Sequence, residues 1–187
     1  MKITYFKAPI KRYTFEVPSI RKWVEENVEG RVLNLFAGVT KLACEEVRVD
    51  SNPEMPADFH MDALDYVQSE VQRGDFQTFL LDPPYAFRKS MTKYQGHVMS
   101  NFKLLKNAII EVVEEGNIVI TFGYHSVCMG QKYNFFQEHL LVLGHGGAQH
   151  DTLAIKERFV PNVDAPSRLK VKRLAELESI LSQTNTY

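Results

Sequence analysis

Residues 76–85 read Phe-Gln-Thr-Phe-Leu-Leu-Asp-Pro-Pro-Tyr, and this stretch decides the fold class. The mostly apolar run from Phe76 to Leu81 predicts a short buried strand. Pro83 and Pro84 fix φ at about −65° and lack a backbone donor, so the strand must end before them. Asp82 is thereby placed at the carboxyl end of the strand. In open sheets of parallel strands, ligands bind beyond this end.

The residues after this predicted strand combine hydrogen-bond acceptors with an aromatic ring. The two prolines leave the local backbone with carbonyl groups only, and Asp82 adds a carboxylate. Tyr85 adds a ring that can stack on a planar partner. An NH2 group on a planar ring needs two acceptors and a stacking surface, and the exocyclic amine of a nucleobase fits this description. We therefore expect a site for such an amine at residues 82–85.

Outward from this stretch, strand and helix patterns alternate along the chain. Apolar runs predict strands at 31–36, 46–49, 76–81, 118–122, 138–143 and 152–157. Helical periodicity predicts helices at 20–28 (with Ser19 as N-cap), 62–71 (with Asp62 as N-cap), 98–114 and 168–181. The alternation is typical of an α/β domain with a mostly parallel sheet. The last two strands, joined by residues 144–151, are expected to form an antiparallel hairpin.

Two other predicted strand ends carry residues typical of a ligand site. Gly38 follows the strand at 31–36, where a glycine lets the backbone approach a ligand. Thr40 stands where a dinucleotide fingerprint would need a second glycine, which disfavours a nicotinamide oxidoreductase. Asp50 follows the next strand, where a carboxylate can accept hydrogen bonds from ribose hydroxyls. Each residue alone also fits a plainer role: a tight turn at Gly38, a surface turn at Asp50 and a helix cap at Asp62.

The order of these motifs resembles that of S-adenosylmethionine-dependent DNA amino-methyltransferases of the adenine-N6 or cytosine-N4 type. Asp82-Pro83-Pro84-Tyr85 matches the catalytic motif of that family. Asn34-Leu35-Phe36-Ala37-Gly38 resembles its cofactor motif, with Asn34 in place of the usual acid; Val49-Asp50 and Met61-Asp62-Ala63-Leu64 resemble the next two. The resemblance covers roughly residues 30–160. It implies a Rossmann-like methyltransferase fold with a mostly parallel seven-stranded sheet, an antiparallel C-terminal hairpin and helices on both faces, in a single domain spanning residues 1–187.

The resemblance also implies roles for individual residues. Gly38 and Asp50 lie only 12 positions apart, so the helix between their strands is expected to be very short. The cofactor would be S-adenosyl-L-methionine, and the residues that contact it would be Asn34, Phe36, Ala37, Gly38, Asp50 and Asp62. The catalytic residues would be Asp82, Pro83, Pro84 and Tyr85. The basic residues expected to contact substrate phosphates are Arg88, Lys89 and Lys93.

The nature of the substrate stays open at this point. Adenine N6 in DNA is favoured, because cytosine-N4 enzymes more often resemble Ser-Pro-Pro-Tyr. An RNA base N-methyltransferase is the alternative, since enzymes of structured RNA share the motif. Enzymes that methylate protein glutamine resemble Asn-Pro-Pro-Tyr at this position, so Asp82 disfavours that activity. An alternative of another functional class is an inactive partner subunit that binds the cofactor or nucleic acid. Only 102 residues follow Tyr85, so a separate specificity partner or a homodimer could complete target recognition.

The composition narrows the class of protein. A chain of 187 residues that is 44% hydrophobic and 24% charged is expected to form about one globular domain. The net charge of −1 means that any electropositive surface must be local. No apolar stretch approaches the roughly 18 residues of a membrane span, and no signal-peptide pattern is visible. Two cysteines cannot build a disulfide framework, so we expect a cytoplasmic protein with free thiols and no membrane partner.

Two remaining clusters are expected to have plain roles. His145, His150 and Asp151 share a glycine-rich segment, but no metal-ligand spacing accompanies them, so no metal site is expected. A second basic group near the C-terminus is expected to form a solvated helix face, and its members are Arg168, Lys170, Lys172 and Arg173.

Overall fold

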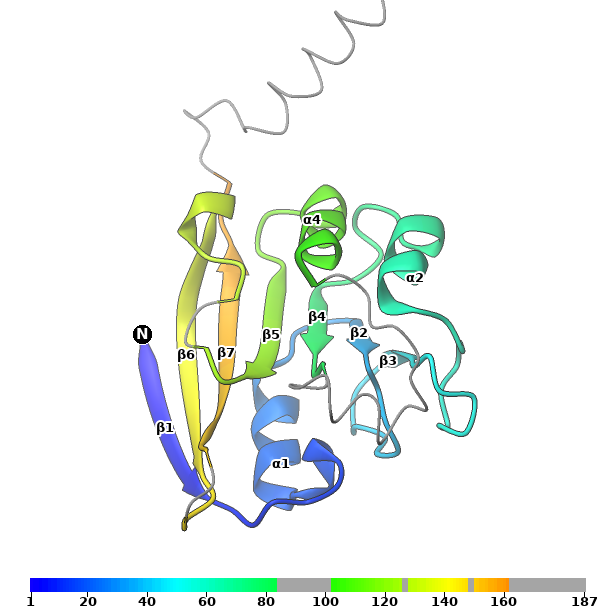
Figure 1. The fold of residues 1–187 in the computed structure, drawn as a ribbon. Coiled ribbons are helices and arrows are strands. Elements are labelled where there is room, and N and C mark those ends of the chain that lie inside the picture. Colours follow the sequence, from blue (N-terminus) through cyan, green and yellow to red (C-terminus); the bar gives the residue numbers. More distant parts are fainter. Residues whose placement is uncertain (84–101, 126–127, 148–149, 162–187) are drawn as a thin grey trace, which may run out of the picture.

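The computed structural model describes residues 1–83, 102–125, 128–147 and 150–161 (Figure 1). One seven-stranded sheet forms its centre, with the strand order β1-β6-β7-β5-β4-β2-β3. The strands are β1 (Lys2–Lys7), β2 (Val32–Leu35), β3 (Glu46–Val49), β4 (Thr78–Leu81), β5 (Ile118–Gly123), β6 (Phe135–Gly144) and β7 (Thr152–Phe159). β7 runs antiparallel to β5 and β6, and the other pairings among the described strands are parallel. The predicted mostly parallel α/β sheet with an antiparallel C-terminal pair is confirmed.

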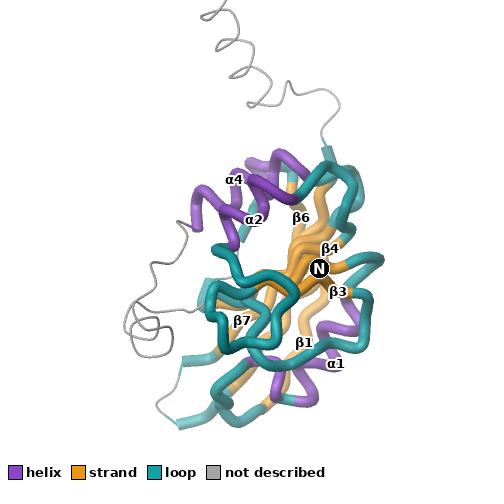
Figure 2. Tube along the Cα trace, turned by 90° about the vertical axis from the view of Figure 1, so that its right-hand side faces the viewer, coloured by secondary structure: helices purple, strands orange, loops and turns teal. Residues whose placement is uncertain are grey.

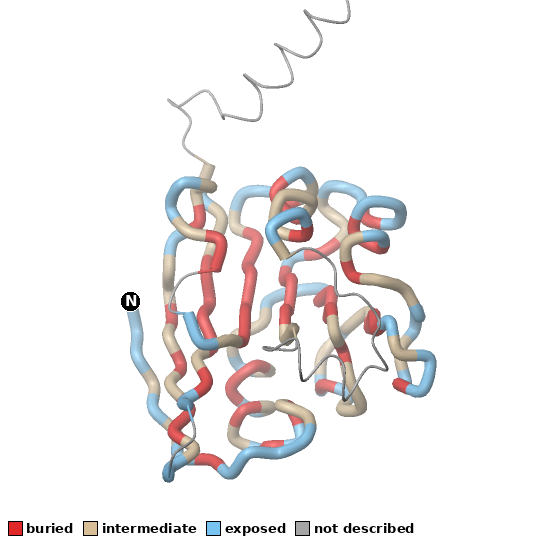
Figure 3. Tube along the Cα trace, in the orientation of Figure 1, coloured by how far each residue is buried: buried red, intermediate tan, exposed pale blue. Residues whose placement is uncertain are grey.

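The inner strands are buried on both faces (Figure 3). All four residues of β2 and all four of β4 are buried. On β4, Phe79 and Leu81 pack into one hydrophobic core, whereas Leu80 packs into the other. Side chains alternate between the two faces of a strand, so a continuous apolar run is what a strand between two layers of helices requires.

Helices cover both faces of the sheet (Figure 2). The helices α2 (Ala63–Glu70) and α4 (Phe102–Val112) lie on one face and contribute residues such as Tyr66 and Ile109 to the first core. The helix α1 (Pro18–Asn27) and the short 3-10 helix η1 (Thr14–Glu16) cover the other face. A second 3-10 helix, η2 (Gln131–Tyr133), precedes β6.

The helix boundaries partly follow the sequence signals. Asp62 caps α2, and its side chain accepts hydrogen bonds from the backbone of Leu64 and Asp65, as predicted. The prediction of Ser19 as the N-cap of α1 is wrong: Val17 is the N-cap and Pro18 begins the helix. Proline suits the first helical position, because the N–H that it lacks has no intrahelical partner there. None of the helices in the described part of the chain combines the length and apolar character needed to cross a bilayer.

The sequence predicted six strands, and the strand that it did not predict is β1. It lies at one edge of the sheet and pairs parallel with β6, from Lys2 opposite His139 to Lys7 opposite Gly144. Its residues are exposed or half-buried throughout. An edge strand with this exposure lacks the apolar run by which the inner strands are recognised.

Between β2 and β3 the expected very short helix is absent. Residues 36–45 connect the two strands as turns and irregular backbone. The predicted helix at 168–181 lies outside the described residues, as do residues 98–101 of the helix predicted at 98–114.

Candidate active site at the carboxyl edge of the sheet

The carboxyl ends of β2, β3 and β4 form one row. Leu35 pairs with Val49 of β3 on one side and with Leu81 of β4 on the other. The residues that follow these three strand ends are Phe36, Asp50 and Asp82. Parallel pairing in this register therefore brings three of the predicted motifs to the same edge of the sheet, where ligands bind in sheets of this kind.

The loop after β2 turns sharply through left-handed backbone. Phe36 has a φ of 67° and Gly38 a φ of 57°. Such values are uncommon for a residue with a Cβ, so Phe36 is held there by its surroundings. The backbone N–H of Ala37 donates to the carbonyl of Val49 over 3.1 Å, which fixes the turn against the end of β3. The half-buried ring of Phe36 packs beside the core under α2 and α4.

Arg48 of β3 holds the same loop from inside the protein. Its side chain is buried, and its guanidinium donates to the carbonyl of Gly38 over 2.8 Å and to that of Ala37 over 3.4 Å. It also donates to the carbonyl of Pro56 in the loop after β3. One buried cation thus ties together the two loops that border the site. Sequence analysis missed Arg48, because its contacts with Gly38 and Pro56, 10 and 8 positions away, form only when the loops on either side of β3 fold back against it.

Asp50 binds the loop from the end of β3. Its Oδ2 accepts a hydrogen bond from the backbone N–H of Gly38 over 2.9 Å, and its Oδ1 accepts from that of Asn52 over 2.9 Å. The residue is only 4% exposed. Asp50 therefore lies where the sequence predicted, and both of its carboxylate oxygens accept backbone hydrogen bonds in this structure.

Asn34 lies below the loop, within β2. It is fully buried, and its Nδ2 donates to Oε2 of Glu46 over 2.8 Å. The other oxygen of Glu46 accepts from the backbone of Leu42 over 2.8 Å and lies 3.6 Å from Nε of Arg48. Asn34 holds Glu46, and Glu46 in turn binds the 36–45 loop at Leu42.

Asp62 lies at the start of α2, beyond the loop that follows β3. Its Oδ1 accepts from the backbone of Leu64 over 2.9 Å, which satisfies one of the unpaired N–H groups at the start of the helix. The loop approaches the sheet through a parallel bridge between Val49 and Phe59. In this structure, Asp62 therefore acts as the N-cap of α2.

The structure describes only part of the motif that the sequence predicts to be catalytic. Asp82 and Pro83 follow β4 directly, and both are half-buried. The other predicted site residues after β4 lie outside the described residues, and they are Pro84, Tyr85, Arg88, Lys89 and Lys93.

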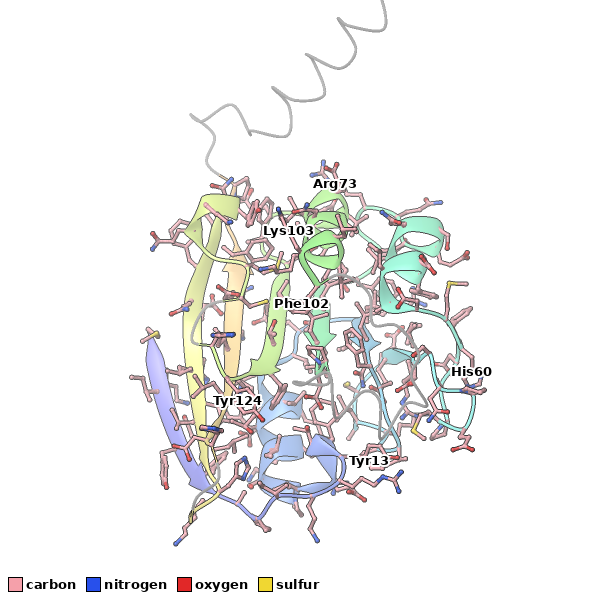
Figure 4. The ribbon with its side chains drawn as sticks, viewed as in Figure 1. Tyr13, His60, Arg73, Phe102, Lys103 and Tyr124 are labelled. Atoms are coloured by element: carbon pink, nitrogen blue, oxygen red, sulfur yellow. The ribbon has the colours of Figure 1, made fainter. Side chains whose placement is uncertain are left out.

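Two tyrosines missed by sequence reasoning lie near this edge (Figure 4). A Cβ on Gly38 would lie 3.3 Å from Cδ1 of Tyr13, so the Tyr13 ring packs against the glycine turn. Tyr124 follows β5, is 41% exposed, and meets the ring of His150 edge to face at 6.0 Å. Tyr13 could not be found from local patterns, because its contact is with a loop 25 residues further along the chain.

Both cysteine thiols are poor nucleophiles at neutral pH. Burial raises the pKa of Cys128 to about 11. Burial, together with the nearby carboxylates of Glu46 and Glu25, raises the pKa of Cys44 to about 11. The thiolate is the reactive form of cysteine, so neither residue is suited to attack a ring carbon of a base.

His145, which follows β6, contacts two other segments of the protein. The ring of His145 lies between the carbonyl of Ala8 (3.0 Å from Nδ1) and the hydroxyl of Thr152 (2.9 Å from Nε2). It joins the end of β1 to the hairpin. Over the described residues, no group of three or more His, Cys, Asp or Glu side chains is arranged to hold a metal ion.

Comparison with known proteins gives no match by sequence and several by fold. No protein-family model matches the chain, and no curated protein does. TrmN from Thermus thermophilus superimposes with a TM-score of 0.53 at 11% identity, over 77% of this chain and 49% of its own. The N-methyltransferase NodS from Bradyrhizobium japonicum WM9 superimposes with a TM-score of 0.52 at 11% identity, over 81% of this chain and 100% of its own. The chain spans about half the length of TrmN and all of NodS, and it has the Rossmann-like fold of methyltransferases.

Proposed function

We propose that this chain is an S-adenosylmethionine-dependent methyltransferase that modifies an exocyclic amine of a nucleobase, with adenine N6 in DNA as the favoured target. One observation carries the proposal: Asp82 and Pro83 directly follow β4, in the same row as the turn at Phe36 and the carboxylate of Asp50. The methyltransferase fold supports the assignment of this edge as the active site. We further propose that residues 1–187 form a single domain.

The residues at this edge fit the cofactor. An adenosyl group needs an apolar surface for its base and acceptors for its hydroxyl and amino groups. The half-buried ring of Phe36 offers the first, and Asp50 after β3 and Asp62 at the start of α2 offer carboxylates. A carboxylate has more acceptor positions than the backbone hydrogen bonds occupy. The loop at Ala37 and Gly38 would lie along the cofactor, with Asn34 supporting it from below.

When bound, the cofactor supplies an electrophilic methyl group carried on a sulfonium. The protein then acts by positioning and electrostatics. The carboxylate of Asp82 and the carbonyl of Pro83 would each accept a hydrogen bond from the amino group of the target. These two hydrogen bonds would orient the nitrogen lone pair towards the methyl group. In the proposed motif Pro84 keeps the backbone rigid, and the Tyr85 ring stacks on the base.

Nitrogen rather than carbon is the proposed target atom. Methylation of a ring carbon would need a nucleophile that adds to the base, and burial raises the pKa of both thiols to about 11. Arg88, Lys89 and Lys93, which follow the motif in sequence, are proposed to contact substrate phosphates. A base in duplex DNA would be turned out of the stack before reaction.

A methyl-transfer assay tests the proposal. Methyl-labelled S-adenosylmethionine is incubated with the protein and with duplex DNA, single-stranded DNA or RNA, and the products are digested to nucleosides for mass spectrometry. We expect N6-methyladenine from DNA. If only RNA yielded N-methylated bases, the substrate would be RNA rather than DNA and the proposed amine chemistry would stand. A carbon-methylated base would overturn the mechanism.

The matched variant for this assay is Asp82→Ala. It should abolish methyl transfer and leave cofactor binding in calorimetry nearly unchanged, because the carboxylate acts on the target amine. Tyr85→Phe should keep substantial activity, whereas Tyr85→Ala should lose stacking worth about 1–3 kcal/mol. If the wild-type protein bound no S-adenosylmethionine, the proposal would fail at its first step.

A further inference from the structure

A basic strap borders the candidate active site. We use this name for residues 7–13, which begin at the last residue of β1 and read Lys-Ala-Pro-Ile-Lys-Arg-Tyr. The first 15 residues contain four basic side chains and no acidic one, in a chain whose net charge is −1. Three of the four, Lys7, Lys11 and Arg12, belong to the strap, and all three are exposed (Figure 3). The basic strap is therefore a local concentration of positive charge.

The basic strap is anchored at both ends to the carboxyl edge of the sheet. At its start, the backbone N–H of Ala8 donates to the carbonyl of Gly144 over 3.1 Å, where β6 ends. The ring of His145 contacts the carbonyl of the same Ala8. At its end, the Tyr13 ring packs against Gly38 in the loop after β2. The basic strap thus runs from the end of β6 to the end of β2, beside the candidate active site (Figures 1 and 4).

Packing immediately after the basic strap keeps it in this position. Phe15 is buried and meets Phe122 of β5 edge to face at 5.5 Å. Within the strap, the guanidinium of Arg12 lies over the Tyr13 ring at 5.4 Å from its centre. The charged groups are therefore carried on a backbone held by buried contacts, with their heads on the surface.

We propose that the basic strap binds the phosphate backbone of the nucleic-acid substrate next to the active site. This inference rests on the proposed function and adds a substrate-binding surface to it. Lys7 and Lys11 are at most roughly 13–14 Å apart along an extended chain. A duplex carries one phosphate per strand for about every 3.4 Å of its axis, so the strap can reach several successive phosphates. Such contacts position the substrate without reading its sequence.

An anionic membrane is the other partner that a basic segment could attract. Ile10 is exposed between the charged residues, which a membrane surface would also favour. The location decides in favour of nucleic acid, because the strap runs along the edge that carries the catalytic motif. A membrane held there would cover the same edge.

Charge-matched variants test the inference. The strap variant carries Lys7→Gln, Lys11→Gln and Arg12→Gln. The control carries Lys22→Gln, Arg73→Gln and Lys132→Gln; Arg73 and Lys132 precede β4 and β6 and so lie towards the opposite edge of the sheet (Arg73 is labelled in Figure 4). Both variants lose three positive charges. All the changed side chains are exposed, so both variants should fold, and thermal unfolding checks that they do.

Binding of labelled DNA and RNA is measured by fluorescence anisotropy over a series of salt concentrations. For duplex DNA, we expect the slope of log K against log salt to become shallower by about 2–3 in the strap variant, and to change little in the control. The loss should be the same for unrelated sequences. Equal changes in both variants would overturn the inference, since they would reflect net charge alone.

Two further outcomes separate this inference from its alternatives. If the strap variant lost binding to phosphatidylserine vesicles but kept its nucleic-acid affinity, the basic strap would be a membrane contact and the inference would be wrong. If the wild-type protein methylated nucleic acid but the strap variant kept the wild-type salt slope, the inference about the basic strap would be wrong and the proposed function would stand. A wild-type protein that neither binds nor methylates nucleic acid would overturn the proposed function with it.

Discussion

Arg48 donates a hydrogen bond through its guanidinium to the carbonyl oxygen of Gly38 over 2.8 Å, although Arg48 is only 5% exposed. A buried cation on the edge strand β3 therefore fixes the backbone of the loop at the candidate active site. The side chain of Glu46, which is fully buried, lies 3.6 Å from the same guanidinium. A buried charge is tolerated when such partners are present, and removal of one partner leaves the other uncompensated.

The stability of the protein should depend strongly on Arg48. Arg48→Met is expected to lower the free energy of unfolding by about 3–5 kcal/mol, because the buried carboxylate of Glu46 loses its cation. Lys22→Met is the matched control: Lys22 pairs with Glu26 on the surface of α1, so its loss should cost about 1 kcal/mol or less. Urea denaturation measures both, and similar losses in the two variants would contradict this account of Arg48.

Cofactor affinity should depend on Asp50. In Asp50→Ala the backbone N–H of Gly38 loses its acceptor, and the loop after β2 is no longer fixed to β3. Asp50 is also a proposed acceptor for the hydroxyl groups of the cofactor, so binding of S-adenosylmethionine should weaken by about 1.5–3 kcal/mol, the usual value of a hydrogen bond to a charged group. Calorimetry measures the change, with Asp65→Ala on the exposed side of α2 as the control that should bind normally. Unchanged affinity in Asp50→Ala would show that the loop does not contribute to binding.

A methyl group at Gly38 should disturb the site more than one at Gly116. Both glycines have positive φ, 57° and 87°, so alanine at either should cost about 1–2 kcal/mol of backbone strain. At Gly38 the added Cβ also lies 3.3 Å from the Tyr13 ring, whereas at Gly116 it meets nothing within 4 Å. Thermal unfolding should show the larger loss for Gly38→Ala, and only this variant should lose cofactor affinity. Equal effects at the two positions would mean that the contact with Tyr13 adds no constraint.

Stability should fall in mild acid because of His139. Its Nε2 accepts from Thr4 Oγ1 over 2.8 Å and from Trp23 Nε1 over 3.4 Å, and its Nδ1 donates to Asn27 Oδ1 over 2.9 Å. The indole N–H can only donate, so this network holds the neutral ring. Burial, followed by the positive charges of Lys2 and Lys156, lowers the pKa of His139.

The sign of this effect follows from the lowered pKa. The unfolded chain binds the proton more readily than the folded one, so the contribution of His139 is present above a pH of about 6.5 and is lost as the pH falls below that value. Urea denaturation at about pH 5 to 7 should show a shallower dependence in His139→Gln than in the wild type. Parallel wild-type and His139→Gln curves would exclude His139 as the titrating group.

The sequence predicted the centre of the fold well, because there the physical signals are local. β2, β4 and β5 are mostly apolar and almost wholly buried, and their alternate residues fill two cores, as expected of strands covered on both faces. The cap at Asp62 was also predictable, since a carboxylate immediately before a periodic segment satisfies the first N–H groups of the helix.

The rest could not be predicted, because it depends on contacts between distant segments. β1 has an exposed pattern and pairs with a strand that begins more than 125 residues later. Asn34 was interpreted as a cofactor residue from its place in a motif, and its contact with Glu46 depends on the register of β2 and β3. Between these strands, the irregular backbone of residues 36–45 is held by Glu46 and Arg48, and these contacts form only in the assembled sheet.

Among the described strands β1 pairs only with β6, which has a consequence for the order in which the protein folds during synthesis. The first strand leaves the ribosome with no neighbour to accept its backbone hydrogen bonds, and its side-chain bond from Thr4 to His139 spans 135 positions. It must wait, unpaired, until residue 144 has emerged. The sheet from β2 to β5 can form before then, because its strands follow one another in the chain. Docking of β1 is therefore a late step of folding during synthesis. The basic strap reaches the edge of the sheet only after most of the chain has been made.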